Sequence, residues 1–170
     1  MIFIATVYLF SSLLFDGELE KGWKGLRVLE SNRSDVERLL GRKPAASDKV
    51  EDHYVIEDVS ILLLYSKGPC VDNTLTGGYN TKAGTVLEYE VVPVKDTLYL
   101  KDLKFNRELY ERWQNNHVIG LVEYHNRQHG IRIITFMEKQ GEVVRTIKFN
   151  PTEKQISEFR CDSIKSNKFS

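Results

Sequence analysis

The segment SNRSDVERLLGRKP, residues 31–44, has the pattern of a short helix followed by a stop signal. The helix can begin at any of three capping residues, Ser31, Asn32 or Ser34. Ser34 and Glu37 have the spacing of a capping box. Three apolar side chains, Val36, Leu39 and Leu40, then share one helical face. Gly41 can adopt the left-handed end and Pro44 prevents continuation, so we predict a helix that ends at Gly41.

Alternating and apolar runs after this helix predict strands. We expect strands at 54–56 and 59–65 around a tight turn at residues 57 and 58, and a third strand at 85–94. Residues 66–84 between them are rich in glycine and form a long loop. Loops of this length inside compact domains are uncommon and often functional.

The order of helix and strands then returns. Asn106 can cap a second helix that runs to about Trp113, with Phe105 and Tyr110 placed for a hydrophobic staple. Three candidate strands follow, at 118–125, 131–137 and 142–149. We therefore predict an α+β fold. It consists of two tandem units, about 31–94 and 96–150, each with one helix and a three-stranded antiparallel sheet, packed as one domain over 31–161.

A helix, a glycine stop, a proline and antiparallel strands resemble the BamE (SmpA) type of envelope module. The resemblance lies in residues 35–41, DVERLLG, with Pro44. A tandem pair of such units resembles the beta-lactamase inhibitory proteins, although this chain has two cysteines in total rather than a disulfide in each unit. The resemblance implies the fold and not beta-lactamase binding. Residues 65–70, YSKGPC, are also similar to a segment of uncharacterised bacterial exported proteins, which favours an exported location.

Composition argues against a nucleic-acid partner. The chain has 24 basic and 24 acidic residues and no net charge. Nucleic-acid binders concentrate positive charge, because the release of counterions from phosphates drives their affinity. We therefore expect a protein or envelope partner instead.

Residues 1–15, MIFIATVYLFSSLLF, contain twelve apolar residues and precede the first charge at Asp16. The run is shorter than the roughly 20 residues of a membrane-spanning helix, and it has the length of a secretory signal. It lacks a preceding Lys or Arg and a clear cleavage site, so a strand or helix packed into the core is the alternative. We predict a targeting segment at 1–15 as the chain's contact with a membrane, a linker at 16–30 and a flexible tail at 162–170.

Cys70 and Cys161 lie far apart, outside any CxxC pattern or Cys/His cluster. This argues against zinc binding and thioredoxin-like chemistry. In an exported protein, periplasmic or extracellular, the two cysteines would form one disulfide that closes a long loop. In a cytosolic protein they would be two buried thiols.

The sequence contains none of the common catalytic or phosphate-binding motifs, and we expect no cofactor. Glu123, His125 and His129 form the best polar group, because two imidazoles and a carboxylate can hold a metal ion. A four-residue loop at 126–129 would place His125 opposite Gly130 and Glu123 opposite Arg132. The simpler interpretation is a cross-strand ion pair between Glu123 and Arg132.

The predicted second sheet has an apolar outer face. Its core face would carry Val122, Tyr124, Ile131, Ile133, Met137, Val143, Ile147 and Phe149. Its other face would carry Ile119, Leu121, Ile134, Phe136 and Val144 beside Glu123, Arg132 and Lys148. An apolar patch with a charged rim is a candidate partner surface. The alternative is that the other unit or the amino terminus covers it.

These observations favour an exported, non-enzymatic binding module that presents an open sheet face and the 66–84 loop to a protein partner. The residues expected in contact are Tyr79, Ile119, Leu121, Arg132 and Phe136, because aromatic residues and Arg dominate binding energy. The alternative is a small metal-dependent hydrolase centred on Glu123, His125 and His129. A third possibility is a structural envelope component without a dissociable ligand.

Overall fold

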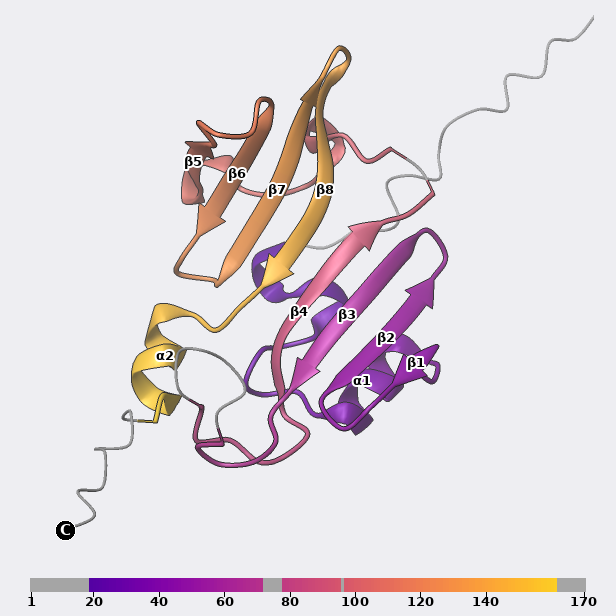
Figure 1. Cartoon of the computed structure of the whole chain (residues 1–170), viewed down its shortest axis with the longest axis vertical. Helices are drawn as coiled ribbons and strands as arrows, with labels where there is room; N and C mark the ends of the chain where they lie inside the picture. The colour runs from indigo at the N-terminus through magenta and orange to yellow at the C-terminus, as the bar shows by residue number, and fades with distance from the viewer. Residues whose placement is uncertain (1–18, 72–77, 96, 162–170) are drawn as a thin grey trace, which may run out of the picture.

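A computed structural model describes residues 19–71, 78–95 and 97–161, and its strands form one antiparallel sheet (Figure 1). The predicted targeting segment at 1–15 and the predicted tail at 162–170 lie outside these residues. The order of the eight strands is β1-β2-β3-β4-β8-β7-β6-β5. Their bounds are β1 Ala46–Ser47, β2 Glu51–Ile56, β3 Val59–Tyr65, β4 Val86–Pro93, β5 Glu111–Gln114, β6 Leu121–Asn126, β7 Ile131–Glu138 and β8 Gly141–Phe149.

Short helices accompany the sheet. The α-helices are α1 Arg33–Leu40 and α2 Glu153–Phe159, and the 3-10 helices are η1 Leu19–Lys21, η2 Trp23–Gly25, η3 Leu100–Asp102 and η4 Arg107–Leu109. Within the described part of the chain, none of these helices has the length and apolar character needed to cross a membrane.

The prediction of two tandem units with separate three-stranded sheets is wrong. Strand β4 pairs with β8, where Tyr89, Glu90 and Val91 face Phe149, Lys148 and Ile147, and this pairing joins both halves into one sheet. On one side of the junction, the rings of Tyr89 and Phe149 stack with centroids 4.4 Å apart. The two halves therefore share one sheet and one core.

The predicted second helix is also wrong. Asn106 does cap a turn, since its side chain accepts a hydrogen bond from the amide of Glu108, but η4 ends at Leu109. Residues 111–114 then pair with β6 as the edge strand β5. The reason is tertiary packing: Tyr110 is buried, and its ring meets that of Phe105 edge to face at 5.0 Å. Burial of these rings outweighs the local preference for a helix.

Helix α1 forms where the sequence predicts it, with a different cap. The Asn32 side chain accepts hydrogen bonds from the amides of Ser34 and Asp35, and Asp35 accepts one from the Asn32 amide. The capping box is therefore Asn32–Asp35 rather than Ser34–Glu37. Gly41 ends the helix with a φ of 65°, as predicted. The helix buries Val36 in the hydrophobic core.

We call the sheet face that packs on the core the inner face. Its most buried side chains are Tyr54, Ile61, Leu63, Tyr89, Ile133 and Ile147. Residues 19–31, predicted largely as linker, cover this face instead. The amide of Trp23 donates to the Tyr89 hydroxyl at 3.1 Å, and that hydroxyl donates to the carbonyl of Leu26 at 3.1 Å. The amino-terminal segment is thus part of the core.

The opposite, outer face follows one row of paired residues across the strands. From β5 to β2 the row reads Glu111, His125, Arg132, Lys148, Glu90, Leu62 and His53. A bulge in β8 changes the faces that we predicted for this strand. Ile134 of β7 pairs with Thr146, whereas the next residue, Thr135, pairs with Val144, so that β8 has one extra residue between them. Val144 consequently joins the inner face opposite Thr135, whereas Val143 lies opposite Phe136. Met137, predicted in the core, is 47% exposed.

Candidate functional site

An apolar groove lies between helix α2 and the adjoining ends of β3 and β4. Its volume is about 360 Å³, within the range of small-ligand sites. The groove is lined by Val50, Leu64, Tyr65, Lys67, Tyr79, Leu87, Glu88, Asn150, Pro151 and Ile156. We call this set of residues the α2 groove. Tyr79, one of the predicted contact residues, lies in it.

The sheet contributes Leu64 and Glu88, which are direct partners across β3 and β4 on the outer face. Beyond this pair the register shifts, so that Tyr65 faces Val86 and Leu87 is left as the extra residue. A bulge of this kind bends the strand and changes the direction of its side chains. Leu87 is buried there and forms part of the groove wall.

Helix α2 forms the other wall. Thr152 and Gln155 make a reciprocal capping box, and the Gln155 side chain also donates to the carbonyl of Val28 at 2.9 Å. The helix has no fully buried side chain of its own, although Ile156 lines the groove. A helix of seven residues is not stable alone in water, so its position depends on these attachments.

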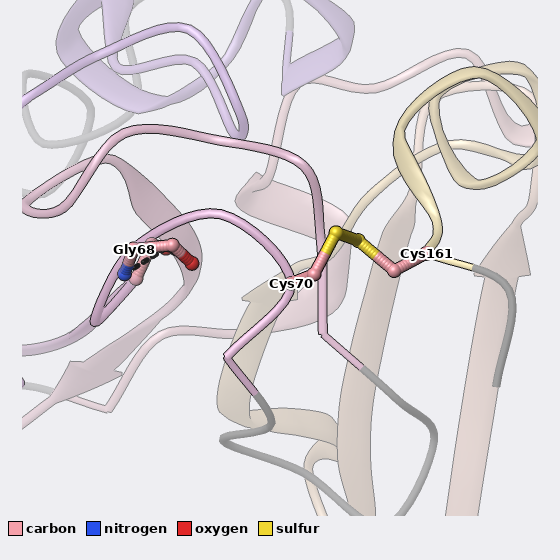
Figure 2. The surroundings of a disulfide bond; sticks show 4 residues. Gly68, Cys70 and Cys161 are labelled. Carbon is pink, nitrogen blue, oxygen red and sulfur yellow. Dashed lines mark hydrogen bonds between the residues drawn. A yellow bond between two sulfur atoms is a disulfide. The ribbon is translucent and has the colours of Figure 1, made fainter. Parts of the chain in front are cut away.

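The predicted disulfide between Cys70 and Cys161 is present and fixes α2 to the 66–84 loop (Figure 2). Backbone hydrogen bonds surround it: the amide of Cys161 donates to Gly78 at 2.9 Å, and the amide of Cys70 donates to Tyr79 at 2.9 Å. Gly78 has no room for a side chain, because a Cβ there would lie 2.6 Å from the carbonyl oxygen of Val71. The disulfide therefore holds both Tyr79 and α2 at the groove.

Glu88 is the acidic side chain of the groove. Burial raises the pKa of its carboxyl above the usual value, while Lys148 opposes that rise and Glu90 adds to it. Lys148 itself donates to the Glu90 carboxylate. Burial also raises the pKa of the Tyr79 hydroxyl, an effect that Arg160 opposes. The groove thus combines apolar walls, an aromatic ring and a carboxyl group that is costly to ionise.

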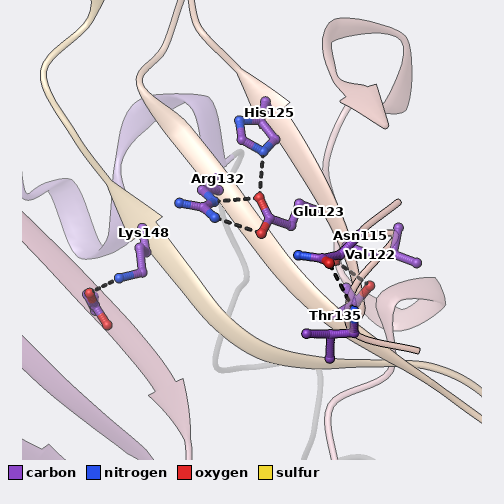
Figure 3. Close-up of polar contacts among 9 residues, drawn as sticks. Asn115, Val122, Glu123, His125, Arg132, Thr135 and Lys148 are labelled. Carbon is purple, nitrogen blue, oxygen red and sulfur yellow. Dashed lines mark hydrogen bonds and ion pairs between the residues drawn. The ribbon is translucent and has the colours of Figure 1, made fainter. Parts of the chain in front are cut away.

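The Glu123 cluster lies on the outer face of β6 and β7 (Figure 3). Arg132 donates to both carboxylate oxygens of Glu123, at 2.8 and 2.7 Å, and a His125 ring nitrogen lies 2.8 Å from the same carboxylate. These bonds lower the pKa of Glu123, with Arg132 as the main cause. The predicted ion pair is therefore confirmed, but it is diagonal, since Arg132 faces His125 in the register and Glu123 faces Ile134.

The metal site suggested by the sequence is not assembled. His129 turns to Asn126, where its Nδ1 lies 3.2 Å from the side-chain oxygen. Across the residues that the structure describes, no three His, Cys, Asp or Glu side chains gather closely enough to hold a metal ion. Glu123 is instead engaged by Arg132 and His125, as in a structural ion-pair cluster.

The other predicted contact residues lie away from the groove. Leu121 and Phe136 face each other across β6 and β7 on the outer face, and both are half-buried. Ile119, in the turn before β6, is 95% exposed. Arg132 shares this face but is bound to Glu123. The structure thus brings Leu121, Phe136 and Arg132 onto one face and assigns Tyr79 to a different site.

Sequence reasoning missed two parts of the groove. The alternating pattern around Glu88 predicts that its side chain lies on the solvent-exposed face of the strand. Nothing in the sequence near Glu88 indicates that α2 lies beside it. Helix α2 does have a signal, because Thr152 and Gln155 after Pro151 have the spacing of a capping box.

Comparison with known proteins provides no assignment. No family model matches the chain, and no curated protein matches it. A similar solved structure is the crystal structure of a DUF4309 family protein (YjgB) from Bacillus subtilis subsp. subtilis str. 168. It has 12% sequence identity and a TM-score of 0.43, over 79% of this chain and 88% of that chain. At these values the likeness supports no statement about function.

Proposed function

We propose that this chain is an exported, non-enzymatic binding module that takes a segment of a protein partner into the α2 groove. The observation that carries the proposal is the groove itself, in which Leu64, Tyr79 and Ile156 present apolar surface from three separate elements. Concave apolar sites with a few polar groups are the usual form of binding sites in proteins. Aromatic residues are also enriched at the energetic centres of protein interfaces.

The disulfide supports the exported part of the proposal. Cys70 and Cys161 are bonded, with their Cα atoms 5.5 Å apart, and structural disulfides persist mainly in oxidising compartments. The bond also joins the two segments that carry Tyr79 and α2. An oxidising environment would therefore preserve the groove.

Binding is favoured over the hydrolase alternative by the state of the Glu123 cluster. Both oxygens of Glu123 accept hydrogen bonds from Arg132, so the carboxylate is engaged in an ion pair instead of being available as a ligand or base. A structural envelope component would need a permanent contact surface. The groove is better suited to a dissociable segment, because its volume of about 360 Å³ has the size of a small-ligand site rather than of an extended interface.

Site-specific photo-crosslinking in the native host tests the proposal. Tyr79 is replaced by p-benzoylphenylalanine, and the matched control carries the same group at Leu109, an exposed position outside the groove. We expect a product of defined mass from position 79 alone, with the partner's residue identified by mass spectrometry. Adding Leu64→Ser should reduce its yield several-fold, because the substitution removes apolar contact from the groove wall.

The same products from both positions, or no product from position 79, would overturn the proposal. An intact disulfide and an unchanged near-ultraviolet circular dichroism spectrum show that the Leu64→Ser variant is folded. A second variant, Phe136→Asp, tests whether the partner also contacts the outer face of β7. Its substitution should leave the product from position 79 intact if the groove is the main contact.

A further inference from the structure

Glu88 has no hydrogen-bonding partner for its carboxyl among the residues that the structure describes, although it lines a groove with Leu64, Tyr79 and Ile156. A carboxylate that is partly removed from water loses solvation, and the loss is recovered only when a donor or a cation replaces the water. Glu90, two residues further along the same face, differs from Glu88 in both respects. Glu90 accepts a bond from Lys148 and does not line the groove.

The nearby cations of the chain are engaged elsewhere. Lys148 is bonded to Glu90. Lys67, on the groove wall, lies near enough to Asp48 to lower the pKa of that carboxyl. Arg160, after α2, acts on the Tyr79 hydroxyl. Among the described residues, the carboxylate of Glu88 thus has no cation bonded to it, and Lys148 acts on it only through space.

Resting on the proposed function, we propose that the segment bound in the α2 groove carries a Lys or Arg side chain whose cationic group pairs with Glu88. The carboxylate of Glu88 is complementary in charge to such a ligand, since an ammonium or guanidinium group would supply hydrogen-bond donors to it. Its aliphatic stem would lie against Leu64 and Ile156. The ring of Tyr79 adds an aromatic surface that favours a cation nearby.

Three blocked peptides serve as probes: acetyl-Gly-Leu-Lys-Phe-Gly-amide and its counterparts with Gln or Glu in place of Lys. Titration of the full-length, oxidised, 15N-labelled protein by NMR gives both the affinity and the location of binding. At pH 7.5 we expect the Lys peptide to bind at least about tenfold more tightly than the Gln peptide, as for a charge-assisted hydrogen bond in a partly dry site. The shifted amides should include those of residues 64, 79, 88 and 156.

The decisive variant is Glu88→Gln, which keeps the shape and removes the charge. It should bind the Lys and Gln peptides equally, with the affinity for the Gln peptide retained. The matched control is Glu123→Gln, which removes a half-buried carboxylate from the same sheet face outside the groove and should keep the full preference for Lys. The preference should also disappear as the pH falls and Glu88 takes up a proton.

The outcomes separate this inference from the proposed function. Equal binding of the Lys and Gln peptides by the unmodified protein refutes the pairing with Glu88 and leaves the groove as a binding site. Stronger binding of the Glu peptide also refutes it, because the groove would then select for negative charge. Absence of binding by all three peptides refutes both, since the groove then takes no such segment.

Discussion

Removal of the disulfide tests how the groove is built. The bond joins residues 91 positions apart in the sequence. In the chain-entropy model, closing a loop of that length restricts the unfolded chain by about 4.6 kcal/mol at 25 °C. The variant should lose slightly less stability than this value. Helix α2 has no fully buried side chain, so without the disulfide it gains conformational freedom in the folded state as well. We therefore expect Cys70→Ala/Cys161→Ala to lower the free energy of unfolding by about 4 kcal/mol or slightly less.

Urea unfolding followed by tryptophan fluorescence measures this loss, since Trp23 is buried in the core. Alanine is the matched replacement at Cys70, because that residue has a φ of 57° and alanine carries the same Cβ. Addition of dithiothreitol should destabilise the unmodified protein and leave the variant unchanged. A loss below about 1 kcal/mol would refute the chain-entropy reasoning for this loop.

Hydrogen exchange gives the local part of the same prediction. Without the disulfide, α2 keeps its attachment through Gln155 to Val28 and the backbone bond from Asn80 to Phe159. These few bonds do not replace a covalent link, so the α2 amides should exchange much faster in the variant than those of β3. Equal protection of α2 in both proteins would show that the helix does not depend on the disulfide.

The remaining predictions concern single side chains. Glu88→Gln should raise the free energy of unfolding at pH 7.5. Burial raises the pKa of Glu88, so there is a pH range in which the carboxyl is protonated in the folded chain and ionised in the unfolded chain. The free energy of unfolding of the unmodified protein therefore falls as the pH rises from about 4.5 through the pKa of the folded state. The gain should therefore vanish below about pH 4.5 in urea unfolding at several pH values. Tyr89→Phe should cost about 1–3 kcal/mol in the same assay, because the hydroxyl serves two buried backbone groups of the amino-terminal segment. A double-mutant cycle of Glu123→Gln and Arg132→Ala should give a coupling of about 1 kcal/mol, limited by the solvent exposure of Arg132. Because Arg132 lowers the pKa of Glu123, this coupling should be present at neutral pH and be lost as the pH falls through that lowered pKa. Ile119→Ser should change stability by less than about 0.5 kcal/mol, since the side chain is 95% exposed.

Local signals in the sequence predict local structure well in this chain. Helix α1 ends at Gly41 as expected, and strands β3, β7 and β8 lie within one residue of their predicted bounds. The pairing of Cys70 with Cys161 was also predictable, because the chain has two cysteines and no competing partner.

Long-range pairing was not predictable from the same signals. Nothing in β4 or β8 alone specifies that Glu90 faces Lys148, so the two halves were expected as separate sheets. Residues 107–114 follow a helix cap, yet the helical turn η4 stops at Leu109 and residues 111–114 form an edge strand, since burial of Tyr110 decides the backbone there. The exchange of Val143 and Val144 between faces depends on one bulge, and a shift by one residue reverses every side chain beyond it.

The candidate site depends on these long-range contacts. Tyr79 could be proposed from its place in a long loop, whereas Glu88 becomes notable only when Pro151 and Ile156 are seen beside it. The same alternating pattern describes Glu88 and Glu90. Only the structure shows that Glu90 is bonded to Lys148, whereas Glu88 has no hydrogen-bonding partner within the described part of the chain.

A charge at Glu88 has a cost for the folded protein and no compensating bond within the described residues, so stability alone does not explain it. Perturbed titratable groups in clefts are associated with function for this reason. Increased stability of Glu88→Gln together with loss of the preference for the Lys peptide would mean that the same charge weakens the fold and selects the ligand. Increased stability with the preference intact would mean that Glu88 is only a poorly solvated carboxylate. The two measurements on one variant therefore decide whether the groove selects for charge.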